Sequence, residues 1–118
     1  MSKVDVRIVD GVTVATINTK LISSDDAVHI ISKEVKEILN GCETRKVLLN
    51  LERVEMMPSL MIGELIMLKK HFEANKAQLR LCNLRPMIAE SLNISGLCDL
   101  FEIDEDEQTG LQNLQSDS

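Results

Sequence analysis

Residues 46–51 read Lys-Val-Leu-Leu-Asn-Leu, with four apolar side chains in six positions and no clean alternation of apolar and polar residues. This pattern is typical of a central strand that is covered on both of its faces. Pro58 then opens an apolar stretch that continues through Phe72, which predicts a helix that is mostly buried. A buried strand that is followed by a helix indicates an α/β fold.

Strand and helix patterns continue on both sides of this segment. Residues 4–9 and 12–17 alternate around Asp10-Gly11, which predicts a β-hairpin, and residues 23–26 (Ser-Ser-Asp-Asp) can cap a helix that ends at Asn40-Gly41. The later segments predict a strand over 78–84, a short helix from Pro86 through Leu92, a short edge strand over 101–103 and a last helix over 105–114. We therefore expect an α/β fold with a mixed, mostly parallel central sheet of about five strands, an N-terminal β-hairpin and four helices.

The chain length of 118 residues corresponds to one domain. We expect residues 1–114 to form this domain and residues 115–118 to fray as a C-terminal tail. Hydrophobic residues make up 44% of the chain and charged residues 27%, which is close to the average for globular domains. Aromatic residues make up only 2%, so the chain lacks the stacking side chains with which proteins bind bases and sugars.

The net charge of -6 comes from the C-terminal end of the chain. Seven acids and no Lys or Arg lie between Asp99 and Ser118, which leaves 13 basic against 12 acidic residues before position 99. A neutral body lacks the basic surface that nucleic-acid and anionic-membrane binders need, so we expect neither partner. Residues 102–107 lack the spacing of a calcium loop and are expected to form a solvated acidic face.

The cysteines and the N-terminus indicate the compartment. Cys42, Cys82 and Cys98 are odd in number and widely spaced, which signals neither a disulfide framework nor a zinc site, and no metal or other cofactor is expected. The N-terminal residues contain no apolar signal segment, and no stretch approaches the roughly 18 apolar residues of a membrane span. We therefore expect a cytoplasmic protein without membrane insertion.

Three segments of the chain, taken in their order, can be compared with the motifs of a known family. They are residues 47–52 (Val-Leu-Leu-Asn-Leu-Glu), residues 58–65 (Pro-Ser-Leu-Met-Ile-Gly-Glu-Leu) and residues 94–103 (Ile-Ser-Gly-Leu-Cys-Asp-Leu-Phe-Glu-Ile). They resemble, in turn, the central strand, the Asp-Ser-Ser/Thr-Gly-Leu-Gly motif and the Gly-Leu-x-x-Leu-Phe segment of the STAS domain family. This is the fold of the bacterial anti-sigma factor antagonists.

The resemblance implies a function in protein binding. In this family, a serine at the start of the second helix is phosphorylated by a partner anti-sigma factor that is also a serine kinase, and phosphorylation releases the partner. Ser59 falls at this position. Its expected place in the first helical turn suits a phosphate, because free N–H groups and the positive end of the helix dipole lie there. About -1.5 to -2 added charges in an apolar contact would repel the partner.

The sequence also departs from the family motif. Pro58, Leu60 and Met61 stand where the family has Asp, Ser/Thr and Gly, and Ile22 stands where it often has a second acid. One alternative is that Ser59 only bonds its own backbone. Another alternative is a degenerate STAS subunit that assembles constitutively into a larger signalling or transport complex.

We expect a partner-binding surface where the family docks its partner, although the methionines in this set could equally be core residues. Its predicted residues are Ile22, Ser23, Met56, Met57, Pro58, Ser59, Leu60 and Met61. A third reading, a small enzyme or a carrier of a lipid or nucleotide, lacks any convergent set of polar catalytic residues, so we do not expect an enzyme. The sequence leaves a homo-oligomer open.

Overall fold

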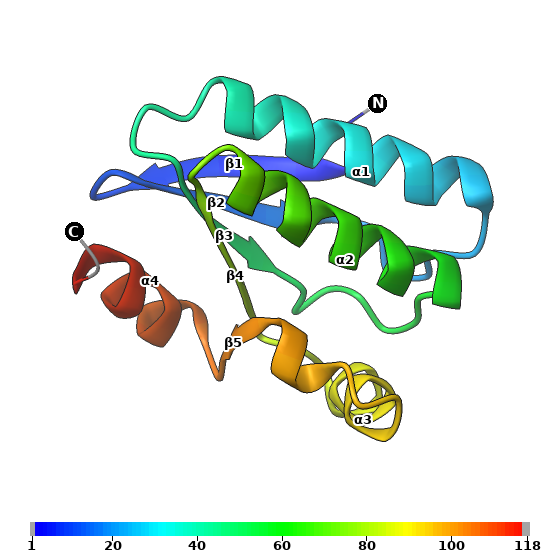
Figure 1. The fold of residues 1–118 in the computed structure, drawn as a ribbon. Coiled ribbons are helices and arrows are strands. Elements are labelled where there is room, and N and C mark those ends of the chain that lie inside the picture. The colour runs from blue at the N-terminus through cyan, green and yellow to red at the C-terminus, as the bar shows by residue number, and fades with distance from the viewer. Residues whose placement is uncertain (1, 117–118) are drawn as a thin grey trace.

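The computed structural model describes residues 2–116 and contains a five-stranded sheet with helices on both faces (Figure 1). Helices α1 and α2 cover one face, and α4 covers the other. The elements are β1 (Val4–Val9), β2 (Val12–Ile17), α1 (Asp25–Asn40), β3 (Lys46–Asn50), α2 (Ser59–Ala74), β4 (Gln78–Cys82), α3 (Pro86–Ile94), the 3-10 helix η1 (Cys98–Leu100), β5 (Glu102–Asp104) and α4 (Glu107–Ser116).

The sheet has the spatial order β1-β2-β3-β4-β5. Strands β1 and β2 pair antiparallel, and each later neighbour pairs parallel. The predicted hairpin and the mostly parallel sheet are therefore confirmed. Asp10 and Gly11 both have positive φ, at 48° and 84°, which is the conformation of the two-residue turn that matches the twist of a hairpin. Strand β3 lies at the centre, and four of its five residues are buried.

Helix α1 follows the predicted boundaries, because its capping residues are local. Ser24 is the N-cap, and its hydroxyl accepts a 3.1 Å hydrogen bond from the Ala27 N–H. Helix α2 differs from the prediction that it is mostly buried. Only one stripe lies in the core, formed by Met61, Leu65, Leu68 and Phe72. The opposite face reaches solvent, since none of the elements described in residues 2–116 packs over it, and Met67 there is 56% exposed.

The two faces of the sheet carry separate hydrophobic clusters. The larger cluster fills the space between the sheet and helices α1 and α2, with α3 closing one end. The smaller one lies under α4 and consists of Val12, Leu48, Cys82 and Leu114, with Leu111 packed against it. Helix α4 is thus held by few apolar contacts.

The C-terminal elements are shifted from their predicted places. Strand β4 ends at Cys82 rather than at residue 84, and β5 begins at Glu102 rather than at residue 101. Helix α4 continues through Ser116, so the first two residues of the predicted frayed tail are helical. Residues 117 and 118 lie outside the described residues.

Candidate functional site

Three connections meet at the carboxyl ends of the parallel strands. The loop after β2 and the loop after β3 form a short bridge between Leu21 and Met56. The Ile22 N–H donates to the Met56 carbonyl at 3.0 Å, and the Glu55 N–H donates to the Lys20 carbonyl at 2.8 Å. These bonds hold the two loops as one surface. This edge of an α/β sheet is where ligands and partners commonly bind.

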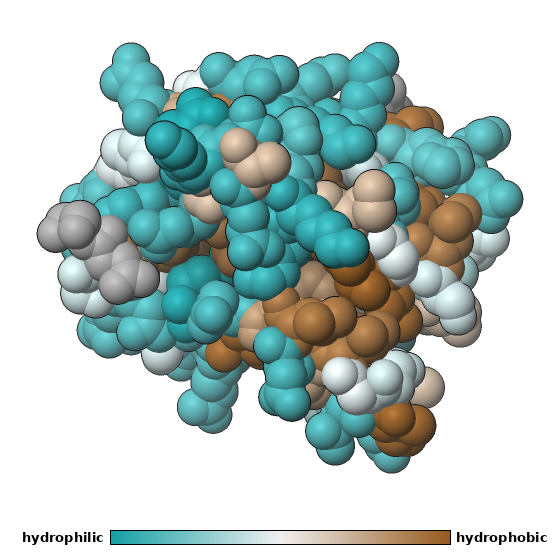
Figure 2. Space-filling view, viewed as in Figure 1, coloured by the Kyte–Doolittle hydropathy of each residue, from teal (hydrophilic) through white to brown (hydrophobic). Residues whose placement is uncertain are grey.

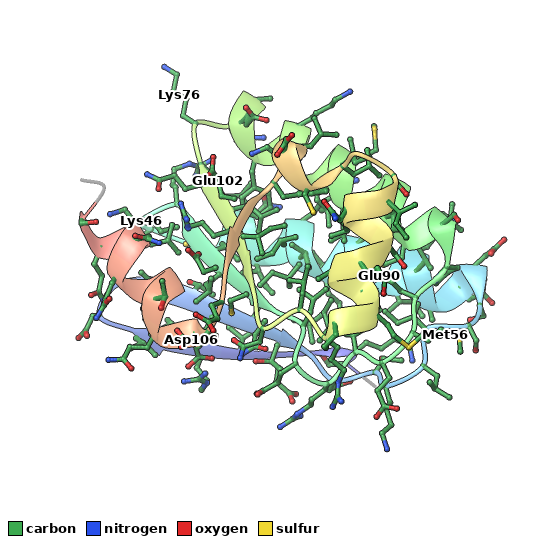
Figure 3. The ribbon with its side chains drawn as sticks, turned by 90° about the horizontal axis from the view of Figure 1, so that it is seen from below. Lys46, Met56, Lys76, Glu90, Glu102 and Asp106 are labelled. Carbon is green, nitrogen blue, oxygen red and sulfur yellow. The ribbon has the colours of Figure 1, made fainter. Side chains whose placement is uncertain are left out.

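The third connection, between β4 and α3, is tied to the same loops. Arg85 Nε donates to the Glu52 carbonyl at 2.8 Å. The start of α3 thereby borders a shallow groove whose walls are mainly apolar, formed by Leu21, Met56, Pro86 and Met87. In Figure 3, Met56 lies at the end of the molecule away from Lys46, beyond the α3 residue Glu90. The groove therefore belongs to the carboxyl-end edge of the sheet.

Ser59 is the first residue of α2 and is exposed. Pro58 precedes it in an extended conformation and provides no side-chain cap, and the first turn of the helix contains no acid. Within residues 2–116, no side chain or backbone group bonds the Ser59 hydroxyl, so the alternative that it bonds its own backbone is not observed. The hydroxyl therefore stands free at the positive end of a helix, where a phosphate group is electrostatically favoured.

Exposed hydrophobic side chains lie on the same loops as Ser59 and at the start of α3. Leu21 is 53% exposed, Met56 55%, Leu60 39% and Met87 73%. Met57 and Pro58 are half-buried, and Ser23 is exposed. We call the following set the carboxyl-end surface: Leu21, Ser23, Met56, Met57, Pro58, Ser59, Leu60 and Met87. Figure 2 shows that apolar side chains also gather where α2, α3 and η1 meet.

Two predicted members of this surface lie in the core instead. Ile22 is 1% exposed and Met61 is fully buried, so neither can contact a docked partner directly. Ile22 points inward because its neighbour Leu21 forms the bridge to Met56 on the outside. Met61 starts the buried stripe of α2, one turn before Leu65. Ile22 therefore does not lie on the exposed surface where it was expected, and Met61 follows the alternative that the methionines are core residues.

Other members were not predicted from the sequence. Leu21 precedes the predicted Ile22 in the chain. At the bridge to Met56 the backbone is extended, so neighbouring side chains point to opposite sides, with Leu21 exposed and Ile22 buried. Met87 lies 31 residues after Met56 in the chain. Its place beside Met56 depends on the packing of α3 at the end of the larger hydrophobic cluster, for which no local sequence signal exists.

The acidic segment of residues 102–107 is only partly solvated, contrary to the prediction. Asp104 is 5% exposed and accepts two hydrogen bonds from Arg80, at 2.7 and 2.8 Å, and one from Asn113 Nδ2 at 2.7 Å. Glu107 accepts hydrogen bonds from Arg7 and, at 3.1 Å, from Asn50 Nδ2. The sequence pattern missed these pairs because the cations come from distant strands.

These hydrogen bonds change the acidity of both carboxyl groups. The bonds from Arg80 lower the pKa of Asp104 and outweigh the effect of burial. Burial raises the pKa of Glu107, but the hydrogen bonds from Arg7 and Asn50 and the charge of Arg7 bring it below its ordinary value. Both groups are therefore held as carboxylates that fasten β5 and the start of α4 to the sheet.

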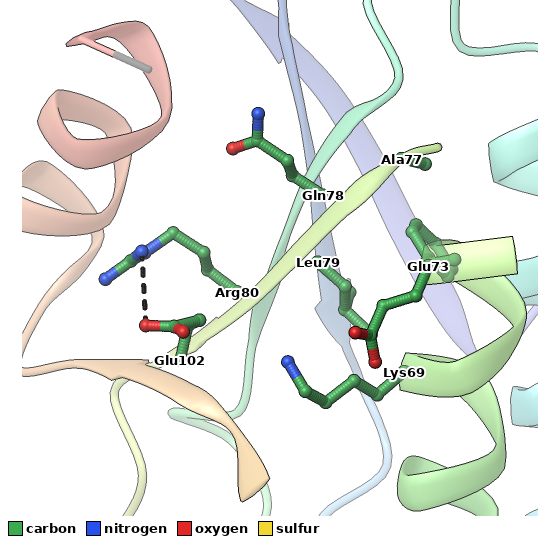
Figure 4. A pocket seen from close by; sticks show the side chains of 8 residues that line it. Lys69, Glu73, Ala77, Gln78, Leu79, Arg80 and Glu102 are labelled. Atoms are coloured by element: carbon green, nitrogen blue, oxygen red, sulfur yellow. Dashed lines mark ion pairs between the residues drawn. The ribbon is translucent and has the colours of Figure 1, made fainter. Parts of the chain in front are cut away.

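A hollow beside the C-terminal half of α2 is lined by charged side chains (Figure 4). Lys69 and Glu73 come from the helix, and Arg80 and Glu102 come from the adjacent strands, with 3.7 Å between Arg80 Nη1 and Glu102 Oε2. These walls differ from the apolar pocket that a lipid carrier needs. Among residues 2–116, no cluster of three or more His, Cys, Asp or Glu side chains is placed to hold a metal ion. Every helix described is too short or too polar to cross a membrane.

The fold and the loop arrangement match a known family. The family model described as STAS domain covers residues 3–110. The chain belongs to the STAS domain family. No curated protein matches this STAS domain by sequence.

Solved structures share the fold over nearly the whole chain. RsbS of Moorella thermoacetica is 21% identical, with a TM-score of 0.80 over 98% of this chain and 97% of that chain. A putative anti-sigma factor antagonist of Thermotoga maritima is 19% identical, with a TM-score of 0.83 over 95% and 94%. The anti-sigma factor antagonist SpoIIAA in its unphosphorylated form is 17% identical, with a TM-score of 0.75 over 98% of each chain. This STAS domain therefore resembles anti-sigma factor antagonists in fold.

Proposed function

We propose that this STAS domain is a cytoplasmic regulatory module that binds an anti-sigma factor and works by binding rather than by catalysis. The partner docks on the carboxyl-end surface. The observation that carries this proposal is the exposed, unbonded Ser59 hydroxyl at the start of α2, next to the exposed Leu60 and three residues after the exposed Met56. Apolar side chains supply affinity, and a hydroxyl beside them supplies a place for a switch.

We propose further that the partner is a serine kinase and that Ser59 is its phosphoacceptor. A phosphate on Ser59 would be tolerated by the isolated domain, because the first turn of α2 carries no acid and the positive end of the helix dipole lies there. In the complex, the same phosphate would place about -1.5 to -2 charges among Met56, Leu60 and the partner's apolar residues. The phosphorylated domain would therefore release its partner.

The docking test compares two methionines of equal exposure. Met56→Glu places a charge on the carboxyl-end surface, and Met67→Glu places the same charge on the outer face of α2, about two turns away. Affinity for the kinase partner, measured by calorimetry, should fall at least about tenfold for Met56→Glu and stay near wild type for Met67→Glu. Equal affinity of both variants would show that the partner binds elsewhere.

The switch test uses Ser59 itself. The wild-type chain, incubated with ATP and the partner, should gain the mass of one phosphate, and Ser59→Ala should gain none while still binding. Ser59→Asp should bind at least about tenfold more weakly. If Ser59→Asp binds normally and the wild type gains no phosphate, the constitutive subunit is the correct reading, which the departures at Pro58, Leu60 and Met61 favour.

A further inference from the structure

The outer edge of β1 is the open edge of the sheet next to the hairpin. Strand β1 pairs only with β2, through the register Val4 opposite Ile17 to Val9 opposite Val12. On its core-side face, Val6 is 52% exposed and Ile8 is 75% exposed. A regular edge strand with exposed branched apolar side chains is a template for pairing with another strand.

Hydrogen bonds at the start of β1 show which backbone groups face outward. The Asn18 N–H donates to the Lys3 carbonyl at 2.9 Å, so Lys3 faces β2. The Val4 N–H donates to Ser2 Oγ at 3.3 Å, and Ser2 Oγ donates to the Val4 carbonyl at 2.8 Å, so Val4 faces away from β2. Because directions alternate along a strand, the N–H and carbonyl groups of Val6 and Ile8 also face away from β2.

The charges of β1 favour one antiparallel register over its two neighbours for a second copy of the strand. Asp5 and Arg7 lie on the opposite face of β1 from Val6. They pair with Arg53 and Glu107 of their own chain, and both side chains are still more than half exposed. A register centred on Asp5 or on Arg7 would place identical charges directly opposite each other, which is destabilising. A register centred on Val6 instead places Asp5 opposite the partner's Arg7 on both sides of the axis.

The Val6-centred register also provides hydrogen-bond partners for the outward N–H and carbonyl groups of β1. It makes Val6 and the partner's Val6 a hydrogen-bonded pair through their outward groups. It also places Val4 opposite the partner's Ile8, where the Val4 N–H and carbonyl exchange their bonds to Ser2 Oγ for bonds to the partner strand. The partner's Ile8 then stands beside a hollow whose lining is half apolar, formed by Ser2, Val4, Val6, Glu34, Glu37 and Ile38. Backbone polarity and side-chain charge thus agree on this arrangement.

We propose that two copies of this chain associate through β1 in this antiparallel register, forming one continuous sheet across a two-fold axis. The edge of β1 lies apart from the carboxyl-end surface, so the dimer presents two such surfaces at once. The proposal does not depend on the proposed function. Loss of the dimer and loss of partner binding are measured separately, on variants of different elements.

Sedimentation velocity over a broad concentration series tests the association of the full chain. The wild type should show a monomer–dimer equilibrium, and Val6→Pro should raise the dissociation constant more than about tenfold, because it removes an outward N–H on both copies. The hydrogen bonds between β1 and β2 should remain, so the far-UV circular dichroism spectrum of Val6→Pro should match that of the wild type. Val6→Thr keeps the N–H and the branched shape and should still dimerise. A wild type that stays monomeric throughout, or a dimer that Val6→Pro leaves unchanged, would overturn the proposal.

Disulfide trapping tests the register without relying on proline. In a Cys98→Ser background, Val6→Cys should form an intermolecular disulfide, since opposed residues of a hydrogen-bonded pair have Cα atoms about 5.5 Å apart. Ile8→Cys is the matched control, because the two copies of position 8 would lie about 13 Å apart along the strands. Equal trapping of both variants, or trapping of Ile8→Cys alone, would refute the Val6-centred register.

Discussion

Gly110 and Gly63 are both helical glycines, but their surroundings are opposite. A Cβ atom on Gly110 would lie 2.6 Å from Leu48 Cδ1 and 3.2 Å from Asp104 Oδ2, whereas a Cβ atom on Gly63 would meet nothing within 4 Å. Leu48 is fully buried and has little room to move. Gly110→Ala should therefore lower the free energy of unfolding by about 1–3 kcal/mol, in spite of the better helix propensity of alanine.

Gly63→Ala is the matched control for this substitution. It adds the same methyl group to an exposed helical position and should raise the free energy of unfolding by about 0.5–1 kcal/mol. Urea unfolding followed by circular dichroism measures both changes. Stabilisation by both substitutions would mean that α4 does not press Gly110 against Leu48.

Single residues also show the limit of what the sequence predicts about the surface. The position of Ser59 at the start of a helix follows from local signals, because Pro58 and the apolar run after it mark that start. Whether Ile22 or Leu21 faces outward depends on one bridge, between Leu21 and Met56, which lie 35 residues apart in the chain. Such a contact has no local signature, so the sequence alone does not show that Ile22 lies in the core while Leu21 is exposed. The place of the partner-binding surface stays a prediction.

At the scale of elements, α4 is fastened to the sheet by polar contacts as well as by the smaller hydrophobic cluster. Asp104, the last residue of β5, binds Arg80 of β4 and accepts a hydrogen bond from Asn113 of α4, and Glu107, in the first turn of α4, binds Arg7 of β1. The sequence pattern predicted a helix over residues 105–114, and α4 is present in this region. The same pattern predicted that the acids of residues 102–107 would be exposed to solvent. This prediction fails because a charged side chain is buried only where a partner of opposite charge binds it. The partners of Asp104 and Glu107 are Arg80 and Arg7, which lie on strands distant in the sequence.

Asp104→Asn tests this attachment through the pH dependence of stability. The pKa of Asp104 is lower in the folded protein than its ordinary value of 3.8. On acidification, the unfolded chain therefore binds the proton first, and the stability contributed by Asp104 is present at neutral pH and lost as the pH falls through the folded pKa. Asp104→Asn should lower the free energy of unfolding by about 2 kcal/mol at neutral pH.

The dependence of the free energy of unfolding on pH separates the contribution of the Asp104 carboxylate from a loss of packing. Between about pH 5 and pH 3, the wild-type free energy of unfolding should fall more steeply than that of Asp104→Asn. Glu105→Gln removes an exposed acid of the same segment and should change neither the neutral value nor the slope. Parallel profiles for the wild type and Asp104→Asn would rule out a contribution from the Asp104 carboxylate.

At the scale of the whole molecule, the two hydrophobic clusters differ in size and in what closes them. The larger cluster is enclosed by two helices of sixteen residues each, whereas the smaller one is closed by the ten-residue α4 alone. Opening of α4 would expose Cys82 and leave the larger cluster intact. We expect α4 to open at a lower free energy than global unfolding, as a separate cooperative unit.

The labelling rates of Cys82 and Cys42 with a thiol reagent measure whether α4 opens separately. Cys82 is fully buried under α4, and burial raises its pKa to about 12, so it should react with a thiol reagent only when α4 opens. In a Cys98→Ser background, the labelling rate of Cys82 should increase about tenfold or more in Gly110→Ala, since a loss of about 1.4 kcal/mol corresponds to a factor of ten. Cys42 belongs to the larger cluster, and its labelling rate should stay unchanged. If Cys42 and Cys82 accelerate together, α4 opens only with global unfolding and the molecule is a single cooperative unit.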